Sequence, residues 1–217
     1  MRQGGAPRLG ASAGRGALCS VVLAALTLSA SGAHAGAVQV EVSDAAGKPL
    51  ADAVVFLDSA EARKQVRPLA GVETAQEKRQ FVPGVLVVPV GTEVLFPNRD
   101  SVRHHVYSFS PAKKFELKLY SGTPSNPVLF DKSGVVVLGC NIHDQMVGWV
   151  LVVDTPHYAR TPAATGKVQL DNVPPGTYTL RTWHTRLPVG TPALEQALTV
   201  PATGTAMASV RMTGLQP

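Results

Sequence analysis

Apolar and polar residues alternate with a period of two in several stretches of the chain, which is the pattern of half-buried β-strands. Residues 37–42, 114–120 and 177–183 follow this alternation closely. Residues 85–90 instead form a continuous apolar run, which is typical of a core strand. The runs are short, and many of the 20 Gly and 17 Pro lie between them, where they favour turns. The pattern therefore predicts an all-β chain.

Short strands separated by turns at this spacing indicate a β-sandwich or a β-barrel. One stretch of mixed charge, residues 58–75, lacks a clear period, and we expect a surface connection there with a helical turn near 59–64. The expected strands cover residues 37–42, 53–57, 76–82, 85–90, 93–96, 104–109, 114–120, 128–130, 135–139, 147–153, 167–170, 177–183, 193–200 and 206–212.

The first 35 residues have the three parts of an export signal. Three arginines and no acidic residue precede a mostly apolar stretch at 17–30, and Ala33-His34-Ala35 is a small-x-small cleavage site. A membrane anchor is the alternative, but the apolar stretch is shorter than the about 20 residues that a bilayer span needs. We expect residues 1–35 to be removed, export to the periplasm, and no stable membrane anchor on the mature chain.

Removal of the signal changes both the charge and the cysteine content. The whole chain has 20 Lys+Arg and 15 Asp+Glu, and loss of three Arg leaves 17 against 15. The remaining basic residues form no patch interleaved with aromatic residues, so we expect no nucleic-acid binding. Cys19 is lost with the signal, and Cys140 then remains as a single cysteine in an oxidising compartment. Cys140 is either a metal ligand or a buried structural residue.

The residues around Cys140 favour the metal. Cys140, His143 and Met146 lie in one short loop between two expected strands, and His104-His105 begins an earlier strand. Two His, one Cys and a weak axial Met are the ligands of a blue-copper electron-transfer site. The residue types leave open which of the two adjacent histidines is the upstream ligand.

Three segments of the sequence carry a resemblance to a known family: residues 87–98, residues 98–106, and residues 134–146 followed by Gly148. On these segments, residues 72–154 resemble a cupredoxin domain, with a ligand loop similar to that of amicyanin. The resemblance implies a Greek-key sandwich that binds one type 1 copper ion. It also implies that the copper ligands are His104, Cys140, His143 and Met146.

The same resemblance marks one departure. His105 stands where cupredoxins often carry an Asn that ties the two ligand loops together. The resemblance therefore implies that this role falls to His105, with or without Asn141.

The flanking segments resemble a second family. Residues 38–57 and 166–178 are similar to the hairpins of carboxypeptidase-regulatory-like, transthyretin-type sandwiches. We therefore expect the first strands of a split transthyretin-like sandwich at 36–60, the copper domain at 72–154, and the remainder of the sandwich at 155–217. The whole arrangement resembles the exported cupredoxin-like proteins of methylamine utilisation.

These observations predict a periplasmic electron carrier and no enzyme. The sequence has no nucleophile elbow, phosphate-binding loop or zinc-protease motif. We expect a redox enzyme or a cytochrome as partner, with electrons crossing at the His143 edge beside Ile142 and Val147. Two alternatives stay open: a protein that stores or delivers copper, and a β-sandwich binding module whose metal site is structural or vestigial.

Overall fold

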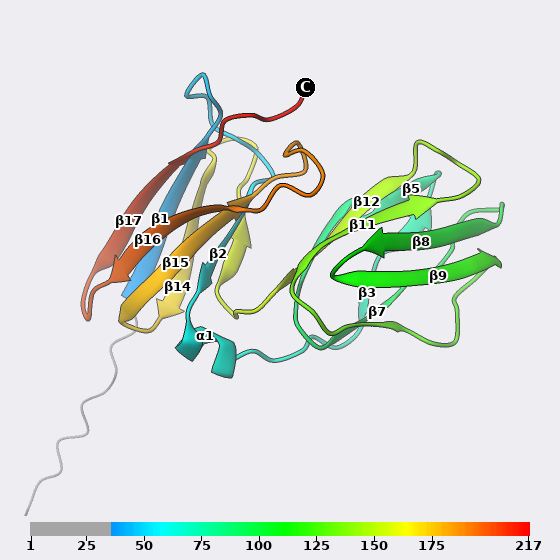
Figure 1. Cartoon of the computed structure of the whole chain (residues 1–217), viewed down its shortest axis with the longest axis horizontal. Coiled ribbons are helices and arrows are strands. Elements are labelled where there is room, and N and C mark those ends of the chain that lie inside the picture. Colours follow the sequence, from blue (N-terminus) through cyan, green and yellow to red (C-terminus); the bar gives the residue numbers. More distant parts are fainter. Residues whose placement is uncertain (1–35) are drawn as a thin grey trace, which may run out of the picture. The chain divides into compact units, whose positions relative to one another are not determined.

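A computed structural model describes residues 36–217, so the expected signal at 1–35 lies outside the described residues. The described part consists of strands and one short helix, which confirms the all-β prediction (Figure 1). Within it, no helix is long and apolar enough to cross a membrane. The elements are β1 (Gly36–Ser43), β2 (Val54–Asp58), α1 (Ala60–Lys64), β3 (Val72–Glu73), β4 (Ala75–Glu77), β5 (Gln80–Val82), β6 (Val85–Pro89), β7 (Thr92–Leu95), β8 (His104–Ser110), β9 (Lys113–Tyr120), β10 (Val128–Phe130), β11 (Gly134–Cys140), β12 (Val147–Val153), β13 (Tyr158–Arg160), β14 (Lys167–Val173), β15 (Gly176–Trp183), β16 (Leu194–Val200) and β17 (Thr205–Arg211).

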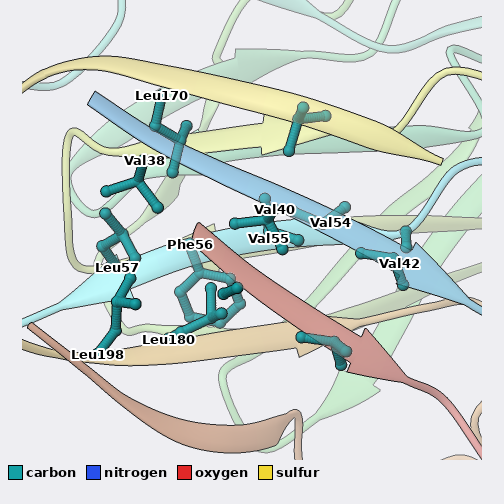
Figure 2. Packing of buried hydrophobic residues seen from close by; sticks show 14 of the residues in the cluster. Val38, Val40, Val42, Val54, Val55, Phe56, Leu57, Leu170, Leu180 and Leu198 are labelled. Carbon is teal, nitrogen blue, oxygen red and sulfur yellow. The ribbon is translucent and has the colours of Figure 1, made fainter. Parts of the chain in front are cut away.

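One pair of sheets is built from strands near the two ends of the described chain. The strand orders are β14-β1-β17 and β13-β2-β15-β16, and β1 pairs antiparallel with β14 but parallel with β17. The alternating valines of β1 are fully buried, and so is most of β2. Figure 2 shows these side chains meeting between the strands. Strands from residues 36–58 and 158–211 thus share one hydrophobic core, while the expected domain boundaries stay predictions.

The other pair of sheets carries the candidate site. A five-stranded sheet has the order β6-β12-β11-β8-β9, and a three-stranded sheet has the order β10-β7-β3. In the larger sheet, β11 lies between β12 and β8 and pairs antiparallel with both. Inward side chains of the two sheets, including Val106, Phe130, Leu138 and Cys140, form a second core together with Met146 from the loop after β11. This arrangement places the end of β11 beside the start of β8.

The structure corrects the prediction of one continuous strand at 76–82. This segment is the hairpin of β4 and β5, and its turn residues Lys78 and Arg79 have φ angles of 52° and 58°. Left-handed backbone at two consecutive non-glycine residues is uncommon and needs support from elsewhere in the fold. The helical turn expected near 59–64 is present as α1, with Ser59 as its N-cap.

Candidate metal centre

Strand register brings Cys140 and His104 to the same face of the larger sheet. Cys140 is the last residue of β11 and lies opposite Val106 of β8. His104 is two residues from Val106, and side chains two apart on a strand point to the same face. Both side chains therefore point into the core, where His104 is 0% exposed and Cys140 is 3% exposed.

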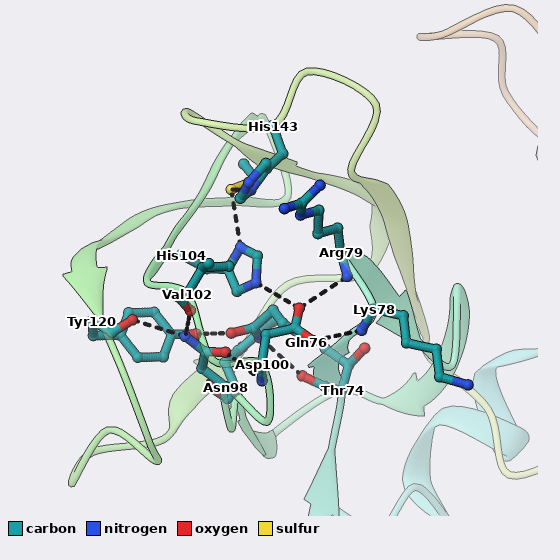
Figure 3. Close-up of polar contacts among 12 residues, drawn as sticks. Thr74, Gln76, Lys78, Arg79, Asn98, Asp100, Val102, His104, Tyr120 and His143 are labelled. Atoms are coloured by element: carbon teal, nitrogen blue, oxygen red, sulfur yellow. Dashed lines mark hydrogen bonds and ion pairs between the residues drawn. The ribbon is translucent and has the colours of Figure 1, made fainter.

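The loop after β11 adds the second imidazole. The Nδ1 atoms of His104 and His143 lie 3.7 Å and 3.8 Å from the Cys140 Sγ atom. One ligand atom from each of these three residues lies within 4.8 Å of the other two. His143 is only partly buried, so one edge of the group reaches the surface. Figure 3 shows both imidazoles converging on the sulfur atom.

His105 lies on the opposite face of β8 from this group. Its Nε2 atom is 2.9 Å from Glu116 Oε1 on β9. Its backbone carbonyl accepts a hydrogen bond of 3.1 Å from the Asn141 N–H group. The ends of β8 and β11 are thus tied at His105 and Asn141 through backbone atoms, while the His105 side chain is directed to Glu116.

Met146 closes the loop that carries His143. Its N–H group donates a 2.9 Å hydrogen bond to the His143 carbonyl, and its side chain is 1% exposed. A buried thioether in this loop suits both an axial ligand and a core residue that fills space. The role of Met146 as a ligand stays a prediction.

Asp100 was not expected at the site, and it contacts the far side of the His104 ring. Its Oδ2 atom is 2.8 Å from His104 Nε2, and its carboxylate also accepts hydrogen bonds from the Lys78 and Arg79 N–H groups. Burial raises the pKa of Asp100, but the hydrogen bonds from Arg79, His104 and Lys78 outweigh this and hold the pKa below its usual value. The signal in the sequence that could have pointed to Asp100 is its position four residues before the candidate ligand His104.

A buried polar network holds the loop that leads to His104. The Asn98 side-chain amide donates 2.9 Å hydrogen bonds to the carbonyls of Val102 and Tyr120. The Tyr120 hydroxyl lies 2.7 Å from both Gln76 Oε1 and the Phe96 carbonyl. Burial raises the pKa of Tyr120, so the hydroxyl stays protonated and remains a donor. The loop is therefore held by its side chains as well as by its backbone.

The donor set has a defined chemical preference. A cysteine thiolate suits soft metal ions, and imidazole suits copper and zinc among others. The trigonal combination of two His and one Cys, with a weak Met nearby, is typical of blue-copper sites. Among residues 36–217, the three residues His104, Cys140 and His143 are the group found with metal-ligand spacing.

Comparisons with known proteins gave matches among solved structures. No family model and no curated protein matches the sequence. A purple cupredoxin from Nitrosopumilus maritimus is 26% identical, with 38% of this chain and 99% of that chain covered and a TM-score of 0.34. An amicyanin variant in its Cu(I) form is 21% identical over 46% of this chain and 98% of that chain, with a TM-score of 0.35.

A copper-containing nitrite reductase from Thermus scotoductus SA-01 is also similar. It is 23% identical over 52% of this chain and 28% of that chain, with a TM-score of 0.36. These TM-scores are low, and the functional proposal below rests on the geometry of the site.

Proposed function

We propose that this protein is a type 1 copper electron carrier and has no enzymatic activity of its own. His104, Cys140 and His143 would bind one copper ion, with Met146 as a weak axial ligand. The observation that carries the proposal is the convergence of one buried thiol and two imidazole Nδ1 atoms within 4.8 Å of one another.

The hydrogen bonds around His104 leave its Nδ1 atom available to a cation. Asp100 accepts two backbone N–H groups and stays ionised, so the His104 Nε2 atom must donate the proton in their contact. With the proton on Nε2, a neutral imidazole has a lone pair on Nδ1, and this atom faces Cys140 Sγ. Two such donor atoms can share either the thiol proton or a soft metal ion, and imidazole and sulfur are both ligands that copper accepts. The residues therefore fit a copper ion.

A copper ion held there would accept and release one electron. The soft thiolate of Cys140 favours the reduced ion, and the two imidazoles favour the oxidised ion. At the site, the start of β8 and the end of β11 are paired in one sheet, so the ligands that they carry have little freedom to rearrange. A ligand frame that suits both oxidation states changes little when the electron moves, and this favours electron transfer.

The partly exposed edge of His143 is the proposed place of electron entry. Ile142 within the loop and Val147 directly after it are 48% and 43% exposed. Exposed apolar side chains at a functional edge are typical of a docking surface. We propose a redox enzyme or a cytochrome as the partner at this edge.

Addition of Cu(II) to the purified protein lacking residues 1–35 tests the proposal. We expect an intense visible absorption band from the copper–thiolate pair, and reversible one-electron voltammetry. Cys140→Ser should remove the band while the far-ultraviolet circular dichroism is retained. A colourless wild-type complex would contradict a type 1 site, and tight Cu(I) binding without reversible voltammetry would favour copper storage or delivery.

Export to the periplasm is a separate proposal, supported by the sequence of residues 1–35. Expression of the full chain in a Gram-negative host should place it in the periplasmic fraction. Mass spectrometry of that fraction should give a mature chain that begins at Gly36. A product that keeps residues 1–35 in the membrane fraction would favour an anchor.

A further inference from the structure

We propose that Asp100 is a positioning residue that selects the tautomer of His104 and aims its Nδ1 atom at the metal. This inference rests on the proposed copper site and adds to it a residue that is not itself a ligand. The Asp100 carboxylate joins the β4–β5 hairpin to His104 through hydrogen bonds (Figure 3).

Three donors surround the Asp100 carboxylate. The Lys78 N–H group donates to Oδ1 at 2.6 Å, and the Arg79 N–H group donates to Oδ2 at 2.9 Å. The Nε2 atom of His104 lies 2.8 Å from the same Oδ2 atom. An ionised carboxylate has only acceptor atoms, so the His104 contact requires a proton on Nε2. In a neutral imidazole this leaves Nδ1 free to bind a metal ion.

The carboxylate is itself held in place. The left-handed backbone of Lys78 and Arg79 presents two consecutive N–H groups to it from a neighbouring hairpin. The Asp100 N–H group donates a 3.0 Å hydrogen bond to Asn98 Oδ1. With backbone and side chain both bonded, Asp100 cannot rotate away without loss of several hydrogen bonds. The ring of His104 therefore has one favoured orientation before any metal binds.

A second His–carboxylate pair in the same strand provides a matched control. His105 Nε2 is 2.9 Å from Glu116 Oε1, at nearly the same distance as the Asp100 pair. His105 points away from Cys140 and is not in the candidate metal group. Glu116→Gln removes one negative charge from a His–carboxylate pair, as Asp100→Asn does, but leaves the His104 ring untouched.

The variant Asp100→Asn tests the proposal because an amide cannot accept from all three donors. The amide NH₂ group of Asn replaces one carboxylate oxygen and is itself a donor. In one orientation it faces the Lys78 N–H group, and in the other it faces both the Arg79 N–H group and His104 Nε2. We expect its Cu(II) affinity to fall by about 10-fold or more, as is usual when the partner of a metal-binding His is removed. Glu116→Gln should keep the wild-type affinity. Equal affinities of Asp100→Asn and the wild-type protein would overturn the proposal.

A measurement on the metal-free wild-type protein does not depend on how well the variant folds. At about pH 8, where an ordinary imidazole is neutral, nitrogen-15 NMR distinguishes the two tautomers of each histidine. We expect His104, assigned from its absence in His104→Gln, to be protonated on Nε2. Asp100→Asn should show a mixture of tautomers, whereas Glu116→Gln should not. A His104 ring protonated on Nδ1 in the wild-type protein would refute the positioning role.

The outcomes separate this inference from the proposed function. If the wild-type protein binds no copper but His104 is protonated on Nε2, the proposed function fails and the tautomer assignment stands. If copper binds with the expected colour but Asp100→Asn changes neither affinity nor tautomer, the site stands and the role of Asp100 is wrong.

Discussion

At the scale of single residues, two adjacent histidines have different environments because a strand turns successive side chains to opposite faces. His104 is fully buried beside Cys140, whereas the His105 ring contacts the half-exposed carboxylate of Glu116. The sequence alone left both as candidate ligands, since neither residue type nor spacing separates neighbours. The pairing of Cys140 with Val106 places the His104 ring, and not the His105 ring, beside the thiol.

Replacement of each histidine checks this choice. We expect His104→Ala to abolish the copper–thiolate absorption band, because one of three strong donors is lost. His105→Ala should keep the band, because its side chain lies on the other face of β8. Visible spectra recorded after addition of Cu(II) measure both effects. Loss of the band in His105→Ala but not in His104→Ala would show that His105 is the upstream ligand.

At the scale of the elements, the strands around the site pack too closely for any side chain at Gly148. A Cβ atom at this position on β12 would lie 2.9 Å from the Cβ and Cδ2 atoms of Phe81. Phe81 is 4% exposed and belongs to the same core as Cys140 and Met146. The close approach positions the hairpin of β4 and β5 against β12, and this hairpin carries the N–H groups that bind Asp100.

Gly148→Ala should therefore destabilise the protein. Overpacking of a well-packed core typically lowers the free energy of unfolding by about 1–3 kcal/mol, and we expect a loss in this range from denaturant titration. Gly84→Ala is the matched control, since the nearest atom to its new Cβ would be the Phe81 carbonyl oxygen at 3.7 Å, an ordinary contact. Equal stability of the two variants would contradict the close packing at Gly148.

At the scale of the whole described chain, distant segments are joined by buried polar contacts as well as by sheets. His184 is 6% exposed, and its Nε2 atom lies 3.1 Å from the Ala51 carbonyl. Its Nδ1 atom accepts a 3.0 Å hydrogen bond from the Arg186 N–H group. Both ring nitrogens are thus satisfied only when the imidazole is neutral. Burial is the largest cause and lowers the pKa of His184; the hydrogen bond to Ala51 opposes it in part, and the charges of Arg186 and Asp52 have smaller, opposite effects.

This environment predicts a loss of stability in mild acid. Below its ordinary pKa of 6.5, His184 binds a proton more readily in the unfolded chain than in the folded one. The free energy of unfolding therefore decreases as the pH falls from 6.5 through the lower pKa of the folded state. His184→Gln should give a shallower decrease between about pH 7.5 and about pH 5, measured by urea titration at each pH. An unchanged slope would show that His184 does not contribute.

Local patterns in the sequence were enough for the fold class and for the types of donor atoms. Alternation with period two and short apolar runs bounded by turn residues are local consequences of strand geometry. Together they predicted most of the strands, and β11 and β12 on either side of the Cys140 loop are such apolar runs. Cysteine, histidine and methionine within one short loop likewise indicated a soft metal. Both inferences depend only on residues that are close in the chain.

Only the tertiary structure decided which groups meet. The support of the hairpin turn at Lys78 and Arg79 by Asp100 and the placement of His104 beside Cys140 each depend on contacts between segments far apart in the sequence. The parallel pairing of β1 with β17 depends on such contacts too. Register and partner choice result from the packing free energy summed over the whole sheet, and no local pattern contains that sum.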